Sequence, residues 1–436
     1  MKVFKFGGAS VSTAERIQNV AQILKKYQGE QVLVVISAMG KYTNALEKVA
    51  EAFFAGNKEE ALRLFENIKQ EHLHIAGELE KDTQVAGNLN MHSVSYTDPS
   101  LQLTDFFTEV EWLLHDKPVR DYDYYYDQVV CVGELLSTAI VSNYLNQVGV
   151  LNQWIDVRDI IRTDDNFRDA VIDWNITAQK VKEQVLPLFN ETNIVLTQGF
   201  IGATDENEST TLGREGSDYT AAVFANLLDA ESQTIWKDVQ GVMNADPKQY
   251  KDAQWIKELN YREVIEMAYY GAQVIHPKTI KPLQNKGIPL YVRSFIHPSE
   301  EGTCIHNKNI NNLPPIIVYK FNQVLVQLTS RDFSFVGEHL TAELYQVFES
   351  LKFKPNLTQN AAISLLCVVD DHPEKVDQLA HAASKHFDVT LAKDLTLLTV
   401  RHYNARLVDE LCKNGEMILR QQTPETIQVL LKTTKQ

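Results

Sequence analysis

The chain has 436 residues, of which 44% are hydrophobic and 23% are charged. This length exceeds what one compact core accommodates, so it predicts two or three domains, and the composition is that of an ordinary globular protein. The formal net charge of −15 argues against nucleic acid or an anionic membrane as a partner.

The sequence lacks the signals of export and of membrane insertion. Residues 1–6 carry cations without a following apolar segment, and no run reaches the roughly 18 apolar residues that span a bilayer. The spacing of the cysteines matches no metal site. We therefore expect a cytoplasmic protein whose thiols are reduced and buried, namely Cys131, Cys304, Cys367 and Cys412.

The first elements predict a parallel sheet. Residues 3–6 form a short apolar strand that runs into a glycine pair, and a helix follows over residues 12–27 from a capping box of Ser12 and Glu15. Residues 32–36 are continuously apolar, which suits a strand buried on both faces. Strand, helix and buried strand together make a βαβ unit.

A long helical region follows over residues 43–116, with a polar loop near residues 87–99. Residues 121–127 consist of Asp and Tyr alone. We predict an acidic, aromatic surface loop there, with its rings folded onto the domain.

Strands and helices then alternate. Helices are predicted over residues 133–147 and 217–228, a strand and loop over residues 194–202, and buried strands over residues 234–236 and 290–292. This alternation predicts a doubly wound, mainly parallel α/β domain over residues 1–300.

The pattern changes after a polar linker over residues 301–315. We expect two small α+β units in tandem, over residues 316–390 and, abbreviated, over residues 391–436, with strands that the two can share. The predicted order is strand 324–328, helix 338–351, strand 363–369, helix 374–385, strands 389–391 and 395–400, helix 405–413, and strands 417–420 and 427–431.

Two glycine-rich segments indicate an anion site. Lys5 lies at the carboxyl end of the first strand, where α/β sheets bind ligands. Arg214 and Asp218 lie in residues 211–219, at a strand-to-helix junction whose N–H groups can wrap an anion. A lone lysine at a strand end is most often a solvated charge, and Asp218 alone could be a helix cap. The neighbouring glycines favour a phosphoryl-transfer site in which Asp218 orients Lys5 or the nucleophile.

Glu134 and Arg214 suit an amino-acid zwitterion, because a carboxylate pairs with an ammonium and a guanidinium with a carboxylate. Each residue taken alone is most often a surface charge. The sequence contains neither a P-loop nor the motifs of protein kinases, so those two mechanisms are excluded.

Taken in chain order, these segments resemble the aspartokinases of the amino-acid kinase superfamily. The resemblance covers about the first two-thirds of the chain, and the tail resembles the paired ACT domains of that family. The matching motifs are residues 5–11, 37–40 with Thr43 and Asn44, 133–137, 198–202, 212–219, and 271–272 with 276–277.

The resemblance implies transfer of the γ-phosphoryl group of ATP, bound with Mg²⁺, to the β-carboxylate of L-aspartate. The product is 4-phospho-L-aspartate, and the reaction is the first step toward lysine, threonine and methionine. The attacking carboxylate is already ionised, so no strong base is needed. Carried over, Lys5 steadies the transferring phosphoryl group and Asp218 holds that lysine. The resemblance places Gly7, Gly8 and Ser37 at the phosphates and Thr43, Glu134, Arg214 and Ser217 at the aspartate.

Four departures from the family pattern fall on the nucleotide side. Lys237 precedes Asp238 where a threonine is usual, Met243 replaces an aromatic residue, Lys248 replaces an arginine, and Gln273 replaces a lysine. We predict that these five residues contact the nucleotide, with the charge of Lys237 compensating for the charge lost at Gln273.

The regulatory end departs further. Asn356 stands where lysine-sensitive members place an aspartate, and Ala361 and Ala362 replace polar residues. Burying an ammonium without a carboxylate partner is costly, which disfavours lysine as the effector. Threonine, another effector or no feedback at all remain open. Paired ACT sheets serve equally as a dimerisation module, and we expect a homodimer or a higher homo-oligomer.

Two alternatives remain. One is an amino-acid kinase that acts on glutamate or N-acetylglutamate, although an acylated substrate has no ammonium to pair with Glu134. The other is a catalytically weak, amino-acid-sensing regulatory protein. The nucleotide-side departures motivate this alternative, and the presence of Lys5 and Asp218 disfavours it.

Overall fold

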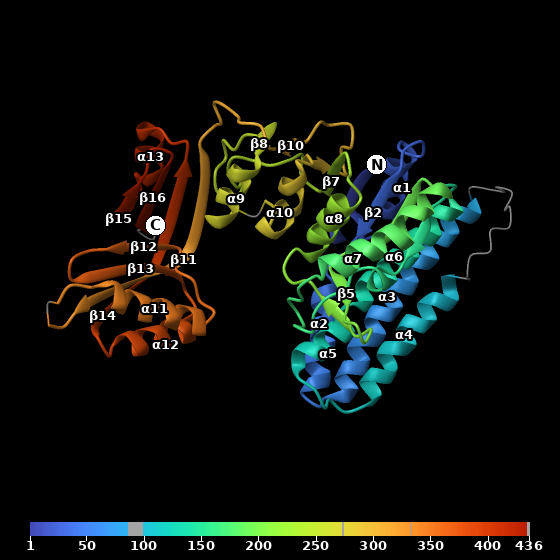
Figure 1. The fold of residues 1–436 in the computed structure, drawn as a ribbon, viewed down its shortest axis with the longest axis horizontal. Helices are drawn as coiled ribbons and strands as arrows, with labels where there is room; N and C mark the ends of the chain where they lie inside the picture. The colour runs from blue at the N-terminus through green and yellow to red at the C-terminus, as the bar shows by residue number, and fades with distance from the viewer. Residues whose placement is uncertain (86–98, 273, 333, 434–436) are drawn as a thin grey trace. The chain divides into compact units, whose positions relative to one another are not determined.

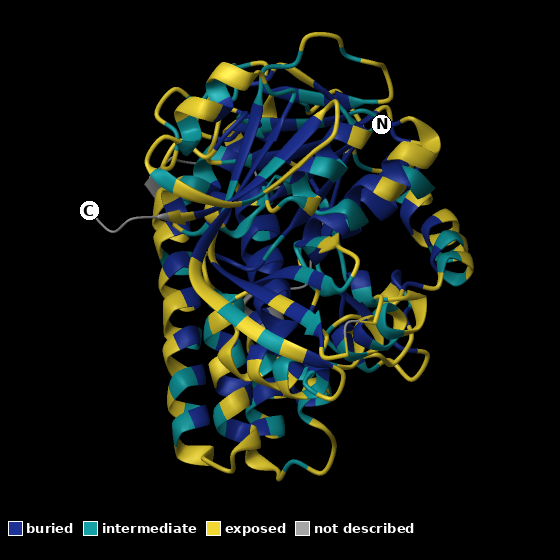
Figure 2. Ribbon diagram, turned by 90° about the vertical axis from the view of Figure 1, so that its left-hand side faces the viewer, coloured by how far each residue is buried: buried dark blue, intermediate teal, exposed yellow. Residues whose placement is uncertain are grey.

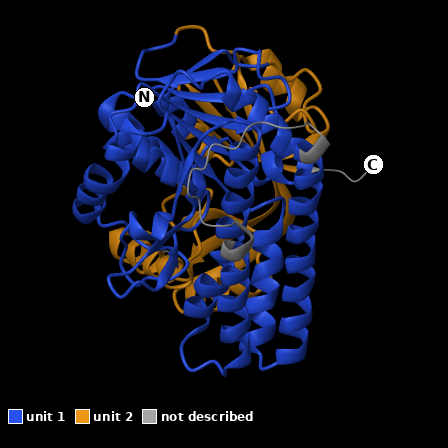
Figure 3. Ribbon diagram, turned by 90° about the vertical axis from the view of Figure 1, so that its right-hand side faces the viewer, with its two compact units in different colours: residues 1–242, 255–265, 274–310 blue, residues 243–254, 266–273, 311–436 orange. Residues whose placement is uncertain are grey.

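The computed structural model describes residues 1–85, 99–272, 274–332 and 334–433. Within it the chain forms two compact units (Figure 3). The first contains residues 1–242, 255–265 and 274–310, and the second contains residues 243–254, 266–273 and 311–436. The loop predicted near residues 87–99 lies almost wholly outside the described residues.

The first unit is built on an eight-stranded sheet in the order β3-β4-β2-β1-β7-β9-β10-β8. The central strand β1 pairs in parallel with β2 on one side and β7 on the other, so the strand order reverses around β1 as in doubly wound sheets. Only the pairing of β10 with β9 is antiparallel among the described strands of this sheet. The strands are β1 (Lys2–Phe6), β2 (Val32–Ile36), β3 (Gln153–Ile155), β4 (Ile194–Gln198), β7 (Ser232–Lys237), β8 (Glu258–Asn260), β9 (Leu290–Ser294) and β10 (Thr303–His306).

The central strands are the core of this unit. Every residue of β2 and β4 is buried, as the dark strands of Figure 2 show. This burial agrees with the continuous apolar run of residues 32–36. The predicted doubly wound, mainly parallel sheet is confirmed. Because residues 303–306 form β10, part of the range predicted as linker is a strand of this sheet.

Helices cover the sheet and extend beyond it, with α2 to α6 packed on one another (Figure 1). The α-helices with residues in this unit are α1 (Ala14–Lys25), α2 (Tyr42–Phe54), α3 (Lys58–Val85), α4 (Pro99–His115), α5 (Tyr122–Val130), α6 (Val132–Gln147), α7 (Trp174–Lys180), α8 (Gly216–Leu227), α9 (Tyr261–Tyr269) and α10 (Pro277–Lys286). Short helical turns lie at Gly8–Val11, Val157–Asp159, Val181–Val185 and Leu186–Asn190, and β5 (Ile201–Ala203) forms a hairpin with β6 (Ser209–Thr211).

Two local predictions were wrong. The cap of α1 is Thr13, whose side chain accepts a hydrogen bond from the Arg16 N–H, and not Ser12. The acidic, aromatic segment is helix α5 and not a surface loop, with Tyr125, Tyr126 and Asp127 buried. Its rings pack on α2, where Phe53 lies 5.2 Å from Tyr125 between ring centroids. Burial of this aromatic face stabilises the helix in spite of its charges.

One helical stretch, Tyr122–Gln147, is long and apolar enough to cross a membrane by length and composition. Its most apolar window is 89% buried inside the protein. This burial is that of a core helix, and core helices can be as long and as apolar as helices that cross a membrane.

The second unit is a six-stranded sheet in the order β12-β13-β11-β14-β16-β15. Its two longest strands, β11 and β14, have 15 residues each and pair with each other. The elements are β11 (Ile316–Ser330), α11 (Glu338–Ser350), β12 (Leu357–Asn360), β13 (Ser364–Asp370), α12 (Pro373–Ala383), β14 (Phe387–Arg401), α13 (Ala405–Cys412), β15 (Gly415–Gln422) and β16 (Thr426–Thr433).

Both long strands contribute residues to three hydrophobic clusters. One cluster joins one part of β11 to α11 and α12, and another joins β14 and β16 to the face covered by α13. The predicted strands over residues 389–391 and 395–400 are therefore one strand, and the boundary drawn at residue 390 falls inside it. β12 was not predicted.

Candidate active site

A cavity of about 550 Å³ opens in the first unit at the carboxyl edge of the sheet. It is lined by the ends of β1 and β7, the loops after β2 and β4, and the first turns of α2, α6 and α8. Nine of the fourteen predicted site residues line it, namely Lys5, Gly8, Ser37, Thr43, Glu134, Arg214, Ser217, Asp218 and Lys237. The parallel topology brings Lys5, Ser37 and Lys237 together, because the carboxyl ends of parallel strands meet at one edge. The first turns of α2, α6 and α8, the short turn after β1 and the turn before α8 supply the others.

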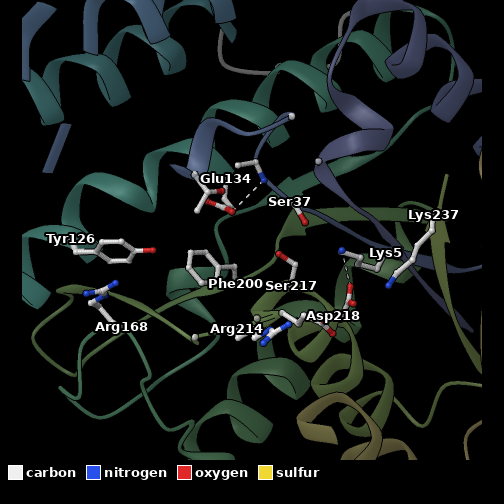
Figure 4. A pocket seen from close by; sticks show the side chains of 17 residues that line it. Lys5, Ser37, Tyr126, Glu134, Arg168, Phe200, Arg214, Ser217, Asp218 and Lys237 are labelled. Atoms are coloured by element: carbon white, nitrogen blue, oxygen red, sulfur yellow. Dashed lines mark hydrogen bonds and ion pairs between the residues drawn. The ribbon is translucent and has the colours of Figure 1, made fainter. Parts of the chain in front are cut away.

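Lys5 and Asp218 form a buried ion pair in this cavity (Figure 4). Their side chains are 11% and 4% exposed, and Lys5 Nζ lies 2.7 Å from Asp218 Oδ1. Burial raises the pKa of Asp218, but the charges of Lys5 and Lys237 outweigh that effect and hold this pKa below its ordinary value. The aspartate is therefore ionised and fixes the lysine ammonium at the end of β1.

Glu134 is a second buried carboxyl group of the cavity, with 2% of its surface exposed. Oε1 accepts a hydrogen bond of 3.2 Å from the Ala38 N–H, whereas Oε2 is buried without a hydrogen-bond partner among the described residues. Burial raises the pKa of Glu134 to about 8, against the weaker opposite effects of the Ala38 N–H and the Lys5 charge. A buried oxygen without a partner at a cavity wall is suited to a donor brought by a ligand.

Two glycines allow the backbone to close around the cavity. A Cβ on Gly8 would lie 2.7 Å from the carbonyl oxygens of Ala38 and Gly40, so only glycine fits between β1 and the loop after β2. A Cβ on Gly199 would lie 2.5 Å from the Ser217 Cβ. Gly199 therefore lets the first turn of α8 approach the end of β4, which brings Ser217 to the cavity.

The segment with Arg214 runs from β6 into α8. Gly213 has a φ of +71°, and a Cβ on it would meet Asp169 Oδ1 at 2.5 Å. Glu215 is also left-handed, with a φ of +54°, and its carboxylate accepts a hydrogen bond of 2.7 Å from the His276 N–H. This tight turn places Arg214, Ser217 and Asp218 on the same cavity.

Lys237, at the end of β7, also lines the cavity, and its Nζ donates a hydrogen bond of 2.9 Å to the Val274 carbonyl. The cavity thus has cations on its Lys5 side and a buried carboxyl group on its Glu134 side (Figure 4). A ligand that bears both anionic groups and an ammonium matches this distribution of charge.

The other predicted residues do not line the cavity. Gly7 lies close to the Lys5 ammonium, since a Cβ on it would be 3.3 Å from Lys5 Nζ. Asp238 is exposed. Met243 and Lys248 belong to the second unit, and Gln273 lies outside the described residues.

Five side chains that line the cavity are outside the predicted set, namely Ala38, Tyr126, Arg168, Phe200 and Glu215. Ala38 and Glu215 lay inside noted motifs without a role. Tyr126 was assigned to a surface loop. Phe200 follows Gly199 directly and lay inside a motif that was noted, so its position gave a usable signal. Arg168 lies in an irregular segment without a motif, and no pattern in the sequence marks it.

Comparison with known proteins agrees with this geometry. The model of the amino acid kinase family matches residues 1–294. The chain is 33% identical to lysine-sensitive aspartokinase 3 of Escherichia coli (strain K12), over 84% of this chain and 78% of that protein. It is 32% identical to chloroplastic aspartokinase 1 of Arabidopsis thaliana, over 84% of this chain and 63% of that protein.

Solved structures show the same fold. The crystal structure of E. coli aspartokinase III in complex with aspartate and ADP matches with a TM-score of 0.77 and 28% identity, over 99% of this chain and 96% of that chain. The aspartate kinase of Clostridium acetobutylicum matches with a TM-score of 0.78 at 21% identity, over the same shares of the two chains.

Proposed function

The chain belongs to the aspartokinases of the amino acid kinase family, and from this premise we propose how its own residues perform the reaction. The γ-phosphoryl group of ATP is transferred to the β-carboxylate of L-aspartate, which gives 4-phospho-L-aspartate. One observation carries the assignment of roles. A single cavity holds a buried lysine–aspartate pair and a buried carboxyl group with an unpartnered oxygen.

The two sides of the cavity separate the two functional ends of the substrate. Glu134 pairs with the α-ammonium through its unpartnered oxygen, and Arg214 holds the α-carboxylate as a guanidinium fork. Thr43 and Ser217 add hydroxyl groups to this amino-acid subsite. The β-carboxylate then points toward Lys5, where the phosphoryl group arrives.

Lys5 stabilises the negative charge of the transferring phosphoryl group, and Asp218 keeps its ammonium at the end of β1. A fixed cation of this kind needs no rearrangement during the reaction. The attacking carboxylate of aspartate is ionised at neutral pH, so the step requires positioning and charge stabilisation rather than a general base.

The nucleotide subsite is proposed on the Lys5 side, with Gly7, Gly8 and Ser37 at the phosphates and Lys237 as an additional cation. Mg²⁺ would arrive with ATP and neutralise phosphate oxygens. Among the described residues no cluster of three metal-binding side chains is present, so the nucleotide and water would supply most of its ligands. Contacts of Asp238, Met243, Lys248 and Gln273 with the nucleotide stay predictions.

The assay that tests this function traps the acyl phosphate with hydroxylamine in the presence of ATP and Mg²⁺. We expect hydroxamate with L-aspartate and much less with L-glutamate or N-acetylglutamate. A preference for either of those two would favour the related amino-acid kinases. Binding of aspartate without hydroxamate at high protein concentration would favour a catalytically weak sensor.

The second unit is proposed to bind an amino-acid effector and to join copies of the chain into a homodimer or larger oligomer in the cytoplasm. A solved structure of E. coli aspartokinase III contains lysine and aspartate. Here Asn356 accepts a hydrogen bond of 2.6 Å from the chain's own Lys320 ammonium and donates to Gln323 and Asp370. Because these contacts satisfy Asn356, we propose that lysine is not the effector at this position. Inhibition by lysine, threonine and methionine, alone and combined, tests this.

A further inference from the structure

Left-handed residues other than glycine gather at the cavity. Among the described residues, ten such residues have a positive φ, and three of them line this one cavity, namely Arg168, Phe200 and Glu215. Side chains with a Cβ disfavour this conformation, and backbone strain of this kind is concentrated at functional sites. Arg168, with a φ of +69°, has no role in the function proposed above.

The backbone of Arg168 is held by a buried carboxylate. Its N–H donates a hydrogen bond of 3.0 Å to Asp127 Oδ2. Asp127 also accepts hydrogen bonds from the Thr211 N–H, at 2.8 Å, and from the Thr211 hydroxyl, at 2.7 Å. Because β6 ends at Thr211, immediately before the segment that carries Arg214, these bonds fix the position of Arg168 relative to that segment.

The guanidinium of Arg168 lies beside a wall of the cavity. Its centre is 4.3 Å from the centre of the Tyr126 ring, and both side chains line the cavity on the Glu134 side, away from Lys5 and Lys237 (Figure 4). Stacking on an aromatic face orients a guanidinium while leaving its edge available for hydrogen bonds.

Two carboxylates hold the same guanidinium loosely. Glu47 Oε1 and Asp123 Oδ1 each accept a hydrogen bond of 3.3 Å from it, longer than the roughly 2.7–2.9 Å of a strong charge-assisted bond. The Arg168 side chain is 40% exposed. A guanidinium has five N–H donors, and these two bonds use two of them. A substrate carboxylate can therefore gain hydrogen bonds from Arg168 without displacing either partner.

We propose that Arg168 is a specificity-determining residue that holds the α-carboxylate of the substrate together with Arg214. The inference rests on the proposed aspartate kinase function. The α-ammonium and α-carboxylate share one carbon atom, so a substrate whose ammonium reaches Glu134 keeps its α-carboxylate close to Glu134, on the side of the cavity that Arg168 lines. The β-carboxylate extends toward Lys5, out of reach of Arg168.

The test replaces Arg168 by glycine, which suits a positive φ, so the variant is expected to fold with an unchanged or higher thermal midpoint. The matched control is Asn207→Gly, in the turn between β5 and β6, where Asn207 also has a positive φ, of +62°, and does not line the cavity. We expect Arg168→Gly to raise KM for L-aspartate at least tenfold and to leave KM for ATP within twofold. Arg168→Lys should recover part of the loss, and the control should match the wild type.

A substrate analogue separates contact from a structural role. The α-amide of L-aspartate lacks the α-carboxylate charge, so its inhibition constant against the wild type and Arg168→Gly should differ by less than twofold. Three results for Arg168→Gly would overturn the proposal: binding of aspartate and of its α-amide weakened equally, a parallel rise in KM for ATP, or an unchanged KM for aspartate. Absence of hydroxamate from the wild type and the Asn207→Gly control would refute the proposed function itself. If the wild type forms hydroxamate and Arg168→Gly has the same KM for L-aspartate as the wild type, only the role of Arg168 is refuted.

Discussion

The raised pKa of Glu134 predicts that aspartate binding depends on pH. Burial raises the pKa of the Glu134 carboxyl group to about 8, so in the absence of aspartate this group is mostly neutral below pH 8. An ammonium pairs with the ionised form, so aspartate binding must release the proton of Glu134. The affinity for aspartate is then expected to increase as the pH rises toward 8 and to level off above it.

The size of the effect follows from the distance between the pKa and the working pH. At pH 7 the neutral form exceeds the ionised form about tenfold, so binding is weakened about elevenfold, or by about 1.4 kcal/mol, relative to high pH. About 0.9 proton should be released for each aspartate bound at pH 7.

Isothermal titration calorimetry between pH 6.5 and 9, in buffers of different ionisation enthalpy, measures both the affinity and the proton release. The range stays above the pKa of Asp127, which burial raises to about 6 against the hydrogen bonds from Arg168 and Thr211. Glu134→Gln is the control, because its binding should be weak and show a smaller dependence on pH. An affinity that does not change with pH, or an equal slope in the wild type and Glu134→Gln, would refute the reasoning.

The same group affects stability. The pKa of Glu134 in the folded protein is above the ordinary value of 4.5, so the folded state binds the proton more tightly than the unfolded state. Its contribution to stability is fully present below about pH 4.5 and is lost as the pH rises to about 8. At pH 7 the loss is on the order of 3 kcal/mol. Urea unfolding without aspartate should therefore show Glu134→Gln to be about 1–3 kcal/mol more stable than the wild type.

Three further substitutions test the geometry. Asp218→Asn removes the counter-ion of Lys5 and should lower kcat about 100-fold while the calorimetric affinity for aspartate changes little; a kcat close to that of the wild type would show that the pair has no role in phosphoryl transfer. Gly199→Ala places a Cβ 2.5 Å from the Ser217 Cβ. This substitution should lower the free energy of unfolding by about 1–3 kcal/mol and raise KM for aspartate. Wild-type values of both quantities would contradict the close approach of Gly199 and Ser217. Lys237→Ala should raise KM for ATP far more than KM for aspartate in steady-state assays, and equal effects on the two would discard a nucleotide role for this lysine.

The sheet and the ends of its strands were predictable because their signals are local. Residues 32–36 are apolar at every position and form β2 as predicted, and parallel strands necessarily place their carboxyl ends at one edge. That rule places Lys5 at the ligand-binding edge, and the expectation that Asp218 meets it rested on the glycine-rich strand-to-helix junction of residues 211–219. In the structure Lys5 Nζ lies 2.7 Å from Asp218 Oδ1, which agrees with this expectation.

Helix α5 was not predictable in the same way. An isolated run of Asp and Tyr has the composition of an exposed loop, and only contacts with distant residues make it helical and buried. Asp127 is an example, since its oxygens bond to Thr211, 84 positions later in the chain. Strand β14 was predicted in two pieces, and β11 was predicted only over residues 324–328, because exposed residues interrupt the apolar pattern of both strands.

The failure at α5 concerns the side of the cavity where Arg168 and Tyr126 lie, and Arg168 itself was missed on that side. Local sequence propensity favours backbone conformations of low free energy in an isolated segment. On this side of the cavity, residues adopt a strained backbone or bury a polar group, and both raise the free energy of the folded protein. Arg168 has a left-handed backbone, and Glu134 has one buried carboxyl oxygen that no described residue partners. Each state lowers the stability of the free protein, and each belongs to a residue whose side chain lines the cavity. If Glu134→Gln and Arg168→Gly both stabilise the free protein and both weaken aspartate binding, this opposition between stability and recognition is established at two independent positions.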